Sequence, residues 1–421
     1  MPIITLTKSI ANKLNSPLRP LTEKQKLKLQ SAIWKIIVSC IFLYPLLPIF
    51  GSRMLDSTVN FVIFCSSLLY IFIFRKNIKK SFFNLIIIVF FLNLFGSALF
   101  VSDLVSNLNK VYDFFIILLL FYFAKLTPKN NQIVLIKTLL LSCCFVAIYS
   151  LWALFNNYFV KELLSQSRAL APFINPNLLA GYLIILIFIS LGLLLQKKEE
   201  AKWVFDKYLA FFCVLISFIA FFFTKSIGGW LSLLSLLPFL LFWRKKINKK
   251  SITAILVIGL LSIIVFYLRL NNPEKITNPF FSIHQRVAYW RGTTEIIKQH
   301  PFVGVGLGNF YLPGSRYSHN SYLQIWGELG MIGILSWLVI VFNYVRMNLK
   351  ILIASKNTLL SLAIFAAGLS FLLHNIVDFS FFIPQVAFLW WIILGLTTRK
   401  FTDISLNDHK NCSQKGNNQK N

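Results

Sequence analysis

Twelve apolar runs occupy most of this 421-residue chain and constrain its fold more than any other feature. A helix needs about 20 residues to cross a bilayer, and in lipid only helices and closed barrels satisfy their own backbone hydrogen bonds. Charged residues make up 13% of the chain, about half the share of a soluble domain. The sequence therefore excludes a soluble globular enzyme and a disordered chain. It predicts an all-α polytopic membrane protein with about twelve transmembrane helices, at 32–50, 57–74, 82–101, 111–126, 133–155, 178–195, 203–224, 227–243, 252–268, 325–345, 359–375 and 383–398.

The net charge of +28 predicts how the chain is threaded. In a soluble protein such a charge would favour nucleic-acid binding, but in a membrane protein basic loops mark the cytoplasmic side and contact anionic lipid. With a cytoplasmic N-terminus, the inside segments hold 28 Lys and Arg residues and the outside segments 11. We therefore expect both termini in the cytoplasm, membrane lipids as partners and no nucleic acid.

The same threading divides the chain into five parts. The polar composition of the last part predicts a disordered tail. In order, the parts are a basic cytoplasmic N-terminus (1–31), nine transmembrane helices with an outside loop at 156–177 (32–268), a large outside loop (269–324), three transmembrane helices (325–398) and a cytoplasmic tail (399–421).

The large outside loop contains a helical repeat of apolar residues over about 282–299, which predicts an amphipathic helix at the membrane surface. Arg286, Tyr289 and Trp290 lie three and four residues apart and share one side of that helix. Arg291 is about 140° around from Arg286, so we expect it in solvent rather than gripping the same ligand. Only Arg286 of the pair is therefore a candidate for the site.

Two further patterns follow in this loop. Gly304, Gly306 and Gly308 alternate, which is neither a Walker loop nor a dinucleotide fingerprint, so they predict a flexible turn back toward the bilayer. His319 then stands at the start of the next helix, and the same stretch contains Arg316, Tyr317, Asn320 and Glu328. A histidine in such polar company is a candidate for proton transfer near neutral pH.

Other polar residues fall on the same outer face. Arg168 precedes an Asn-Pro-Asn turn that contains Asn177, and Lys225 occupies a short turn between two spans. His374 and Asp378 lie four residues apart near the outer end of the eleventh span, where a local His–Asp hydrogen bond accounts for them as well as function does.

Together these residues carry a resemblance to a known superfamily. Arg286-x-x-x-Trp290, the segment His300-Pro-Phe-x-Gly-x-Gly-x-Gly-Asn-Phe310, and His319 followed after ten residues by Gly330 resemble the O-antigen ligase/polymerase superfamily. The Arg168-Ala-x-x-Pro-x-x-x-Pro-Asn177 segment resembles its upstream arginine loop. One departure is the turn Ser226-Ile-Gly228, where the family often has arginine; Lys225 could substitute as a point charge.

The resemblance implies a metal-independent, inverting glycosyltransferase of the GT-C type in the bacterial inner membrane, with its active site on the periplasmic face and no cofactor. The implied donor is a glycan on undecaprenyl diphosphate, and the implied acceptor is lipid A–core, which makes an O-antigen ligase of lipopolysaccharide biosynthesis. The implied catalytic residues are His319, Arg286 and Arg168. The predicted substrate-binding residues are Lys225, Arg316, Tyr289, Trp290, Asn320, Asn177 and Asp378.

Three alternatives stay open at this point. An O-antigen polymerase or a protein O-oligosaccharyltransferase would use the same chemistry on another acceptor. A transporter of bicarbonate or of a lipid-linked sugar would be a different class, but it should place polar residues near the membrane midplane, whereas the span centres here are mostly Leu, Ile and Phe. No cluster with metal-ligand spacing occurs in the sequence, so the predicted cations are Arg and Lys side chains.

Overall fold

The computed structural model describes residues 22–75, 78, 80–100, 104–161, 168–196, 204–242, 249–270, 281–354 and 359–418. Within these ranges the chain forms helices joined by turns, and an isolated bridge between Leu312 and Ser315 is the one strand-like pairing. The α-helices are α2 (Glu23–Leu43), α3 (Leu47–Phe50), α4 (Arg53–Phe74), α5 (Phe82–Ser97), α6 (Leu104–Leu126), α7 (Lys129–Lys161), α8 (Pro176–Leu195), α9 (Val204–Thr224), α10 (Ile227–Phe242), α11 (Lys249–Leu270), α12 (Phe281–Gln299), α13 (Ser321–Ala354), α14 (Leu359–His374) and α15 (Pro384–Asn418). Short 3₁₀ turns η1 (Tyr44–Leu46), η3 (Ala98–Phe100) and η5 (Ser380–Phe382) join some of them.

The all-helical membrane class is confirmed, since every apolar run overlaps one of these helices. By length and composition, seven helical segments of the described chain could cross a membrane, and four shorter apolar helices accompany them. Twelve as the number of spans, and the outside position of the large loop, stay predictions. The seven segments are Lys24–Phe50, Arg53–Phe74, Asn107–Leu126, Lys129–Asn156, Pro176–Leu195, Lys207–Thr224 and Ser321–Ala354.

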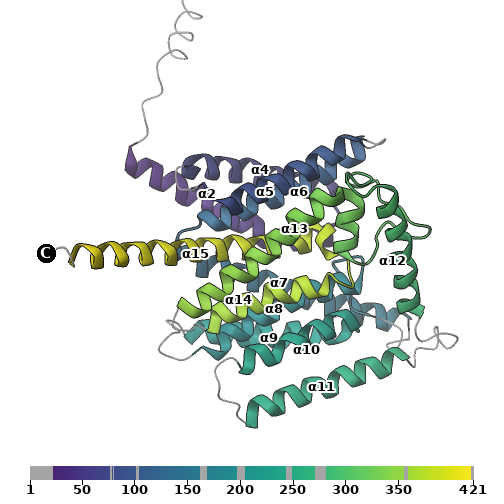
Figure 1. The fold of residues 1–421 in the computed structure, drawn as a ribbon. Helices are drawn as coiled ribbons and strands as arrows, with labels where there is room; N and C mark the ends of the chain where they lie inside the picture. Colours follow the sequence, from purple (N-terminus) through teal and green to yellow (C-terminus); the bar gives the residue numbers. More distant parts are fainter. Residues whose placement is uncertain are drawn as a thin grey trace, which may run out of the picture.

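The helices lie side by side in a bundle, and α12 lies across one end of it (Figure 1). The C-terminal half of α15 extends from the opposite end (Figure 1). α12 contacts α13, and α15 packs mainly against α6 and α13. The start of α13, the end of α14 and the face of α12 therefore meet at one end of the bundle, which we call the loop end.

An aromatic cluster fixes the helices beneath the loop end. Trp337 of α13 packs against Trp390 and Trp391 of α15, with ring centroids 5.0 and 6.1 Å apart. Phe381, in the turn after α14, lies 4.7 Å from the ring of Trp337 and is fully buried. Because large buried rings of this kind dominate core packing energy, the turn that follows α14 rests on a rigid base.

The first and the last of the described helices extend beyond the apolar runs. α2 begins at Glu23, where Thr22 and Gln25 form a capping box, although the apolar run starts only at residue 32. Residues 399–418, for which the composition predicts disorder, continue α15 as helix. Extending a packed helix adds one hydrogen bond per residue without a new nucleation step, so polar residues can follow the packed part in helical form.

Candidate functional site

The predicted amphipathic helix is present as α12, and its faces differ as the spacing predicts. Arg286, Tyr289 and Trp290 are half-buried against the loop end, whereas Arg291 is exposed. Thr293, one turn beyond Tyr289, is fully buried and donates its hydroxyl to the Tyr289 carbonyl at 2.6 Å. Arg286 therefore lies on the face of α12 that is turned toward the site, and Arg291 lies on the exposed face.

His319 sits in the turn before α13 with a left-handed backbone, at φ 53°. Its ring stacks on Tyr289 of α12, with centroids 5.6 Å apart and planes at 19°. The edge of Phe379, in the segment after α14, contacts it at 4.9 Å and 85°. Two separate segments of the chain thus hold the imidazole in one orientation.

Hydrogen bonds fasten the His319 turn to the segment after α14. The Ser321 backbone N–H donates to the Asn375 and Asp378 carbonyls, at 2.9 and 3.0 Å. The Ser321 hydroxyl donates to the Asn375 side-chain oxygen at 2.6 Å. On the other side of His319, the Ser318 hydroxyl donates to the Asn320 carbonyl at 2.6 Å. The position of His319 is therefore set by hydrogen bonds within its own turn and between that turn and the segment after α14.

Charges of both signs act on the imidazole. Burial lowers the pKa of His319; Asp378 opposes this shift because its charge stabilises the imidazolium, and Arg286 adds to it. Burial also lowers the pKa of Arg286, and Asp378 again opposes the shift. The net lowering of the pKa favours the neutral imidazole, and the charge of Asp378 stabilises a positive charge that forms on it.

Asp378 is fully buried in the segment that follows α14, four residues beyond the end of the helix at His374. Burial alone would raise its pKa, but the hydrogen bond and charge of His374, the Ser380 hydroxyl and the charge of Arg286 outweigh it, so the pKa lies below its usual value. The Asp378 Oδ2 atom lies 3.4 Å from His374 Nε2 and accepts a hydrogen bond from the Ser380 hydroxyl. Asp378 is thus an ionised group in contact with His374, and its charge also acts on Arg286 and His319.

Arg168 lies in the loop before α8 and is held at two points. Its Nε atom donates to the Thr224 carbonyl at 2.7 Å, and its Nη2 atom donates to the Asn177 side-chain oxygen at 3.2 Å. The same Asn177 oxygen accepts the Ser226 hydroxyl at 2.9 Å. Two of the five guanidinium donors therefore fix the plane of the group.

His374 connects the Arg168–Asn177 contacts with Asp378. Its Nε2 atom lies 3.0 Å from the Asn177 backbone oxygen as well as 3.4 Å from Asp378. Two glycines allow α8 and α10 to pack this closely against the end of α14. A Cβ atom on Gly181 would lie 2.8 Å from His374 Cδ2, and one on Gly228 would lie 2.7 Å from Val377 Cγ2. Contacts therefore link Arg168, through Asn177 and His374, to the Asp378 carboxylate.

Lys225 occupies the turn between α9 and α10, in a left-handed conformation at φ 48°. It is 7% exposed and lies next to Ser226, which contacts Asn177. The structure therefore brings Lys225 to the same end of the bundle as Arg168, where its positive charge adds to that of the arginine.

The three alternating glycines form a docked loop. All three have positive φ values, and the Val305 and Gly306 backbone N–H groups donate to carbonyls of α13 at Gly327 and Glu328. The helix is kinked there at Gly330, where a Cβ atom would lie 2.1 Å from the Phe302 carbonyl oxygen. The glycines thus allow close backbone contact, which is a structural role.

Arg316 and Asn320 border the site differently. Arg316 is exposed and lines a cavity of about 100 Å³ with Tyr317 and Lys110. The Asn320 side-chain oxygen accepts the Tyr322 and Leu323 backbone N–H groups and so caps α13. This hydrogen bonding gives Asn320 a structural role at the position predicted to bind substrate.

Several residues of the site were not among those predicted from the sequence, including Ser321, Asn375 and Phe379. Tyr317 stacks on Phe379 at 4.0 Å and 12°, and Ser321 and Asn375 join the two loops as described above. The sequence signal for them was proximity alone, since each is a near neighbour of His319 or Asp378. Within the described part of the chain, no group of three or more His, Cys, Asp or Glu side chains is placed to hold a metal ion.

Comparison with known proteins identifies a family for part of the chain. Residues 212–338 match the family described as O-antigen ligase. This segment runs from α9 to α13 and includes Lys225, Arg286 and His319, whereas Arg168 and Asp378 lie outside it. No curated protein matches the chain. The family match confirms the resemblance to the O-antigen ligase/polymerase superfamily and supports a membrane enzyme of the glycosyltransferase type, with a lipid-linked glycan and an acceptor as partners.

Proposed function

We propose that this protein transfers a glycan from undecaprenyl diphosphate to the hydroxyl of an acceptor sugar at the periplasmic face of the bacterial inner membrane. The observation that carries the proposal is that His319 contacts both Tyr289 of α12, the helix that carries Arg286, and Phe379, the neighbour of Asp378, at the loop end. The family match over residues 212–338 supports the reaction class.

The arginines suit a diphosphate leaving group. Negative charge grows on the phosphate oxygens as the bond to the sugar breaks, and fixed guanidinium groups stabilise such charge with paired hydrogen bonds. The charge of Asp378 acts on both Arg286 and His319, and Arg168 is held rigidly by Thr224 and Asn177. We assign Arg286 and Arg168 to the diphosphate, with Lys225 as an additional cation.

His319 suits the acceptor. In a single displacement, the acceptor oxygen forms the new bond to the anomeric carbon, its proton passes to the imidazole, and the diphosphate leaves with the bonding electrons. A base must be neutral before it acts, and the lowered pKa of His319 meets that requirement at pH 7. Asp378 then stabilises the imidazolium. A displacement of this kind inverts the anomeric centre and needs no metal ion.

The acceptor that we propose is lipid A–core, which makes the protein an O-antigen ligase. The ten-residue spacing between His319 and Gly330 supports this choice over a polymerase, whose acceptor is a second lipid-linked repeat unit. Tyr289, which stacks on His319, and Trp290 provide aromatic surface of the type that packs against sugar rings.

The test is a transfer assay with the purified full-length protein. An undecaprenyl-diphosphate glycan is supplied either with lipid A–core or with no added acceptor. Glycan on core supports the ligase, and a ladder of products without core identifies a polymerase instead. If neither product forms, and the protein carries solute across vesicles, the enzyme proposal is wrong and transport replaces it.

Two substitutions separate the roles of His319 in this assay. His319→Ala should remove most turnover while donor binding is retained, because the arginines bind the diphosphate; general-base assistance is worth about 10²–10⁴-fold. His319→Gln keeps a hydrogen bond but no base, so partial activity would indicate orientation of the hydroxyl rather than proton transfer. Wild-type transfer by His319→Ala at matched expression would leave the histidine with a structural role only.

A further inference from the structure

A cationic cavity of about 340 Å³ lies far from the loop end. It opens between the start of α5, the end of α6, α13 and α15. Arg346, which lines it, is 25 residues along α13 from Ser321, about 37 Å at the rise of an α-helix. The cavity is therefore a separate site at the opposite end of the bundle.

Four basic residues line this cavity: Lys80, Lys125, Arg346 and Arg399. None of its described lining residues is acidic, and the remaining polar ones are Ser81, Asn343, Thr398 and Thr402. Like charges gathered around one cavity repel each other, and a negative charge among them relieves that repulsion. An anion in the cavity would supply that charge.

Lys125 makes the strongest case, because it is only 8% exposed. Its Nζ atom donates to the Asn84 side-chain oxygen and lies 5.7 Å from the ring centroids of Phe121 and Tyr122. Within the described residues no carboxylate forms an ion pair with it. A buried ammonium group that has only a neutral hydrogen-bond partner is costly to maintain, and it becomes favourable when an anion binds beside it.

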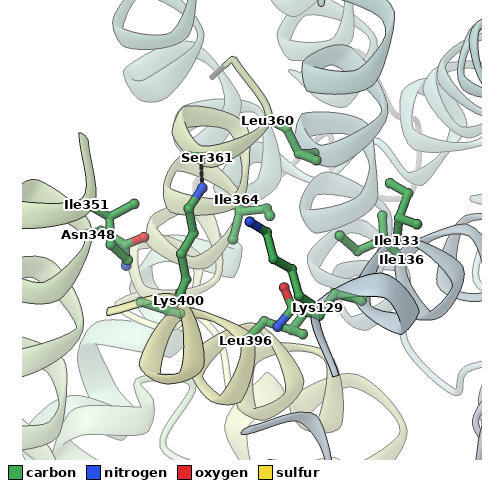
Figure 2. Close-up of a pocket in the computed structure, with 12 residues that line it drawn as sticks. Lys129, Ile133, Ile136, Asn348, Ile351, Leu360, Ser361, Ile364, Leu396 and Lys400 are labelled. Carbon is green, nitrogen blue, oxygen red and sulfur yellow. Dashed lines mark hydrogen bonds between the residues drawn. The ribbon is translucent and has the colours of Figure 1, made fainter. Parts of the chain in front are cut away.

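A second cavity on the other face of α15 provides a comparison. It has a volume of about 210 Å³, and Figure 2 shows the Lys129 and Lys400 side chains extending into it among apolar residues. Lys400 already donates to the Ser361 hydroxyl, and Lys129 is exposed. This second cavity has only two cationic lining residues, and neither is fully buried. An anion is therefore less strongly favoured here than in the cavity that Lys125 lines.

We propose that the cavity lined by Lys125, Arg346 and Arg399 binds a phosphate-bearing anion, and that the anion is the headgroup of an acidic phospholipid. Guanidinium groups pair with phosphate oxygens through two parallel hydrogen bonds, which a lysine pair cannot do. The same cavity has an apolar side made by Phe82, Phe83, Leu126, Met347 and Phe401, which suits the chains of a lipid. Its volume falls in the range of small-molecule sites.

The test measures binding by the full-length protein in phosphatidylcholine nanodiscs. One arm titrates short-chain phosphatidylglycerol and a second arm titrates inorganic diphosphate, each followed by the shift in melting temperature. Arg346→Gln and Lys125→Met remove cations from the cavity. Lys400→Gln removes the same charge from the neighbouring cavity and is the matched control. Arg346 is exposed, so its substitution tests the proposal even if Lys125→Met does not fold.

We expect phosphatidylglycerol to bind the wild type and Lys400→Gln equally, and each cavity substitution to weaken binding on the order of tenfold. If only diphosphate binds, and binding depends on Arg346, the site is a phosphate site whose ligand is soluble. The proposal is overturned if neither probe binds, if the cavity variants bind like the wild type, or if Lys400→Gln weakens binding as much as they do.

Discussion

Asp378→Asn offers the sharpest test of the electrostatics at the loop end. The carboxylate is fully buried and its charge acts on both His319 and Arg286. Asparagine has the same shape but no charge. Burial and Arg286 both lower the pKa of His319, and Asp378 is the group that opposes them. The substitution should therefore lower the pKa of His319 further.

The direction of the change in activity follows from the role of His319. A base works when it is neutral, so transfer declines as the pH falls through the pKa of His319. In Asp378→Asn the acidic limb of the profile of kcat/KM against pH should move to lower pH. The maximal rate should also fall, because the imidazolium that forms during transfer loses a nearby negative charge. A hydrogen bond to a charged group contributes about 1.5–3 kcal/mol, or roughly 10- to 150-fold in rate, and we expect this longer-range interaction to contribute at the lower end of that range.

The assay is glycan transfer by purified protein between pH 5 and 8, with Glu295→Gln as control. Glu295 is a surface carboxylate on α12, paired with Lys298 at 2.8 Å, with a side chain that is 63% exposed. Its neutralisation should leave the rate and the pH profile unchanged. A loss of activity in Asp378→Asn with the acidic limb unmoved, or moved to higher pH, would contradict the reasoning and leave Asp378 a structural role.

Three further predictions concern orientation, the arginines and the glycine loop. In a cysteine-free background, Glu295→Cys should react with an impermeant thiol reagent from the periplasm and Lys28→Cys only after the inner membrane is permeabilised; the reverse pattern would invert the topology. Arg286→Lys should lower the transfer rate about 10²–10³-fold, because one ammonium cannot replace a bidentate guanidinium, whereas Arg291→Lys on the same helix should be nearly neutral; equal effects would show that the two faces of α12 are assigned wrongly. Gly330→Ala should lower the free energy of unfolding by about 2 kcal/mol or more, since φ is 68° and the new Cβ would meet the Phe302 carbonyl at 2.1 Å; an unchanged melting curve would contradict this.

The sequence predicted those parts of the site that depend on local periodicity. The apolar repeat over 282–299 predicts a helix, and the structure has α12 at Phe281–Gln299. The five-residue spacing predicts that Arg286 and Arg291 lie on different faces, and in the structure the first is half-buried and the second exposed. The helices were predictable for the same reason, because bilayer-length apolar runs have few other ways to satisfy their backbone hydrogen bonds.

The contacts between loops were not predictable in this way. Asn177, Ser226 and His374 are far apart in the sequence, and the hydrogen bonds that join them arise only when α8, α10 and α14 pack together. The same holds for Asn375, whose side-chain oxygen accepts both the Ser321 hydroxyl and the Phe381 backbone N–H. A single sequence carries no signal for such pairings, since Asn and Ser are common in any turn.

The alternating glycines show a further limit. Their spacing predicts a flexible turn, yet Gly304 and Gly308 pack against α13 and α6, where a Cβ atom would lie 2.4 Å from Glu328 and 2.3 Å from Asn107. A glycine that provides freedom and a glycine that permits close packing look the same in a sequence. Only the partner surface distinguishes them, and here the surfaces are the kink of α13 for Gly304 and the start of α6 for Gly308.

The left-handed backbone of His319 explains why the site needs its neighbours. A non-glycine residue at φ 53° is strained by about 1–3 kcal/mol, so the turn keeps this conformation only where other contacts stabilise it. The hydrogen bonds from Ser321 to Asn375 and Asp378 are such contacts, and they tie the conformation of the base to the segment that carries its carboxylate. Loss of the Ser321 hydroxyl would therefore move the imidazole and the carboxylate relative to each other. Because proton transfer needs both groups in fixed geometry, rigidity at this junction is as necessary to the proposed reaction as the chemistry of His319 itself.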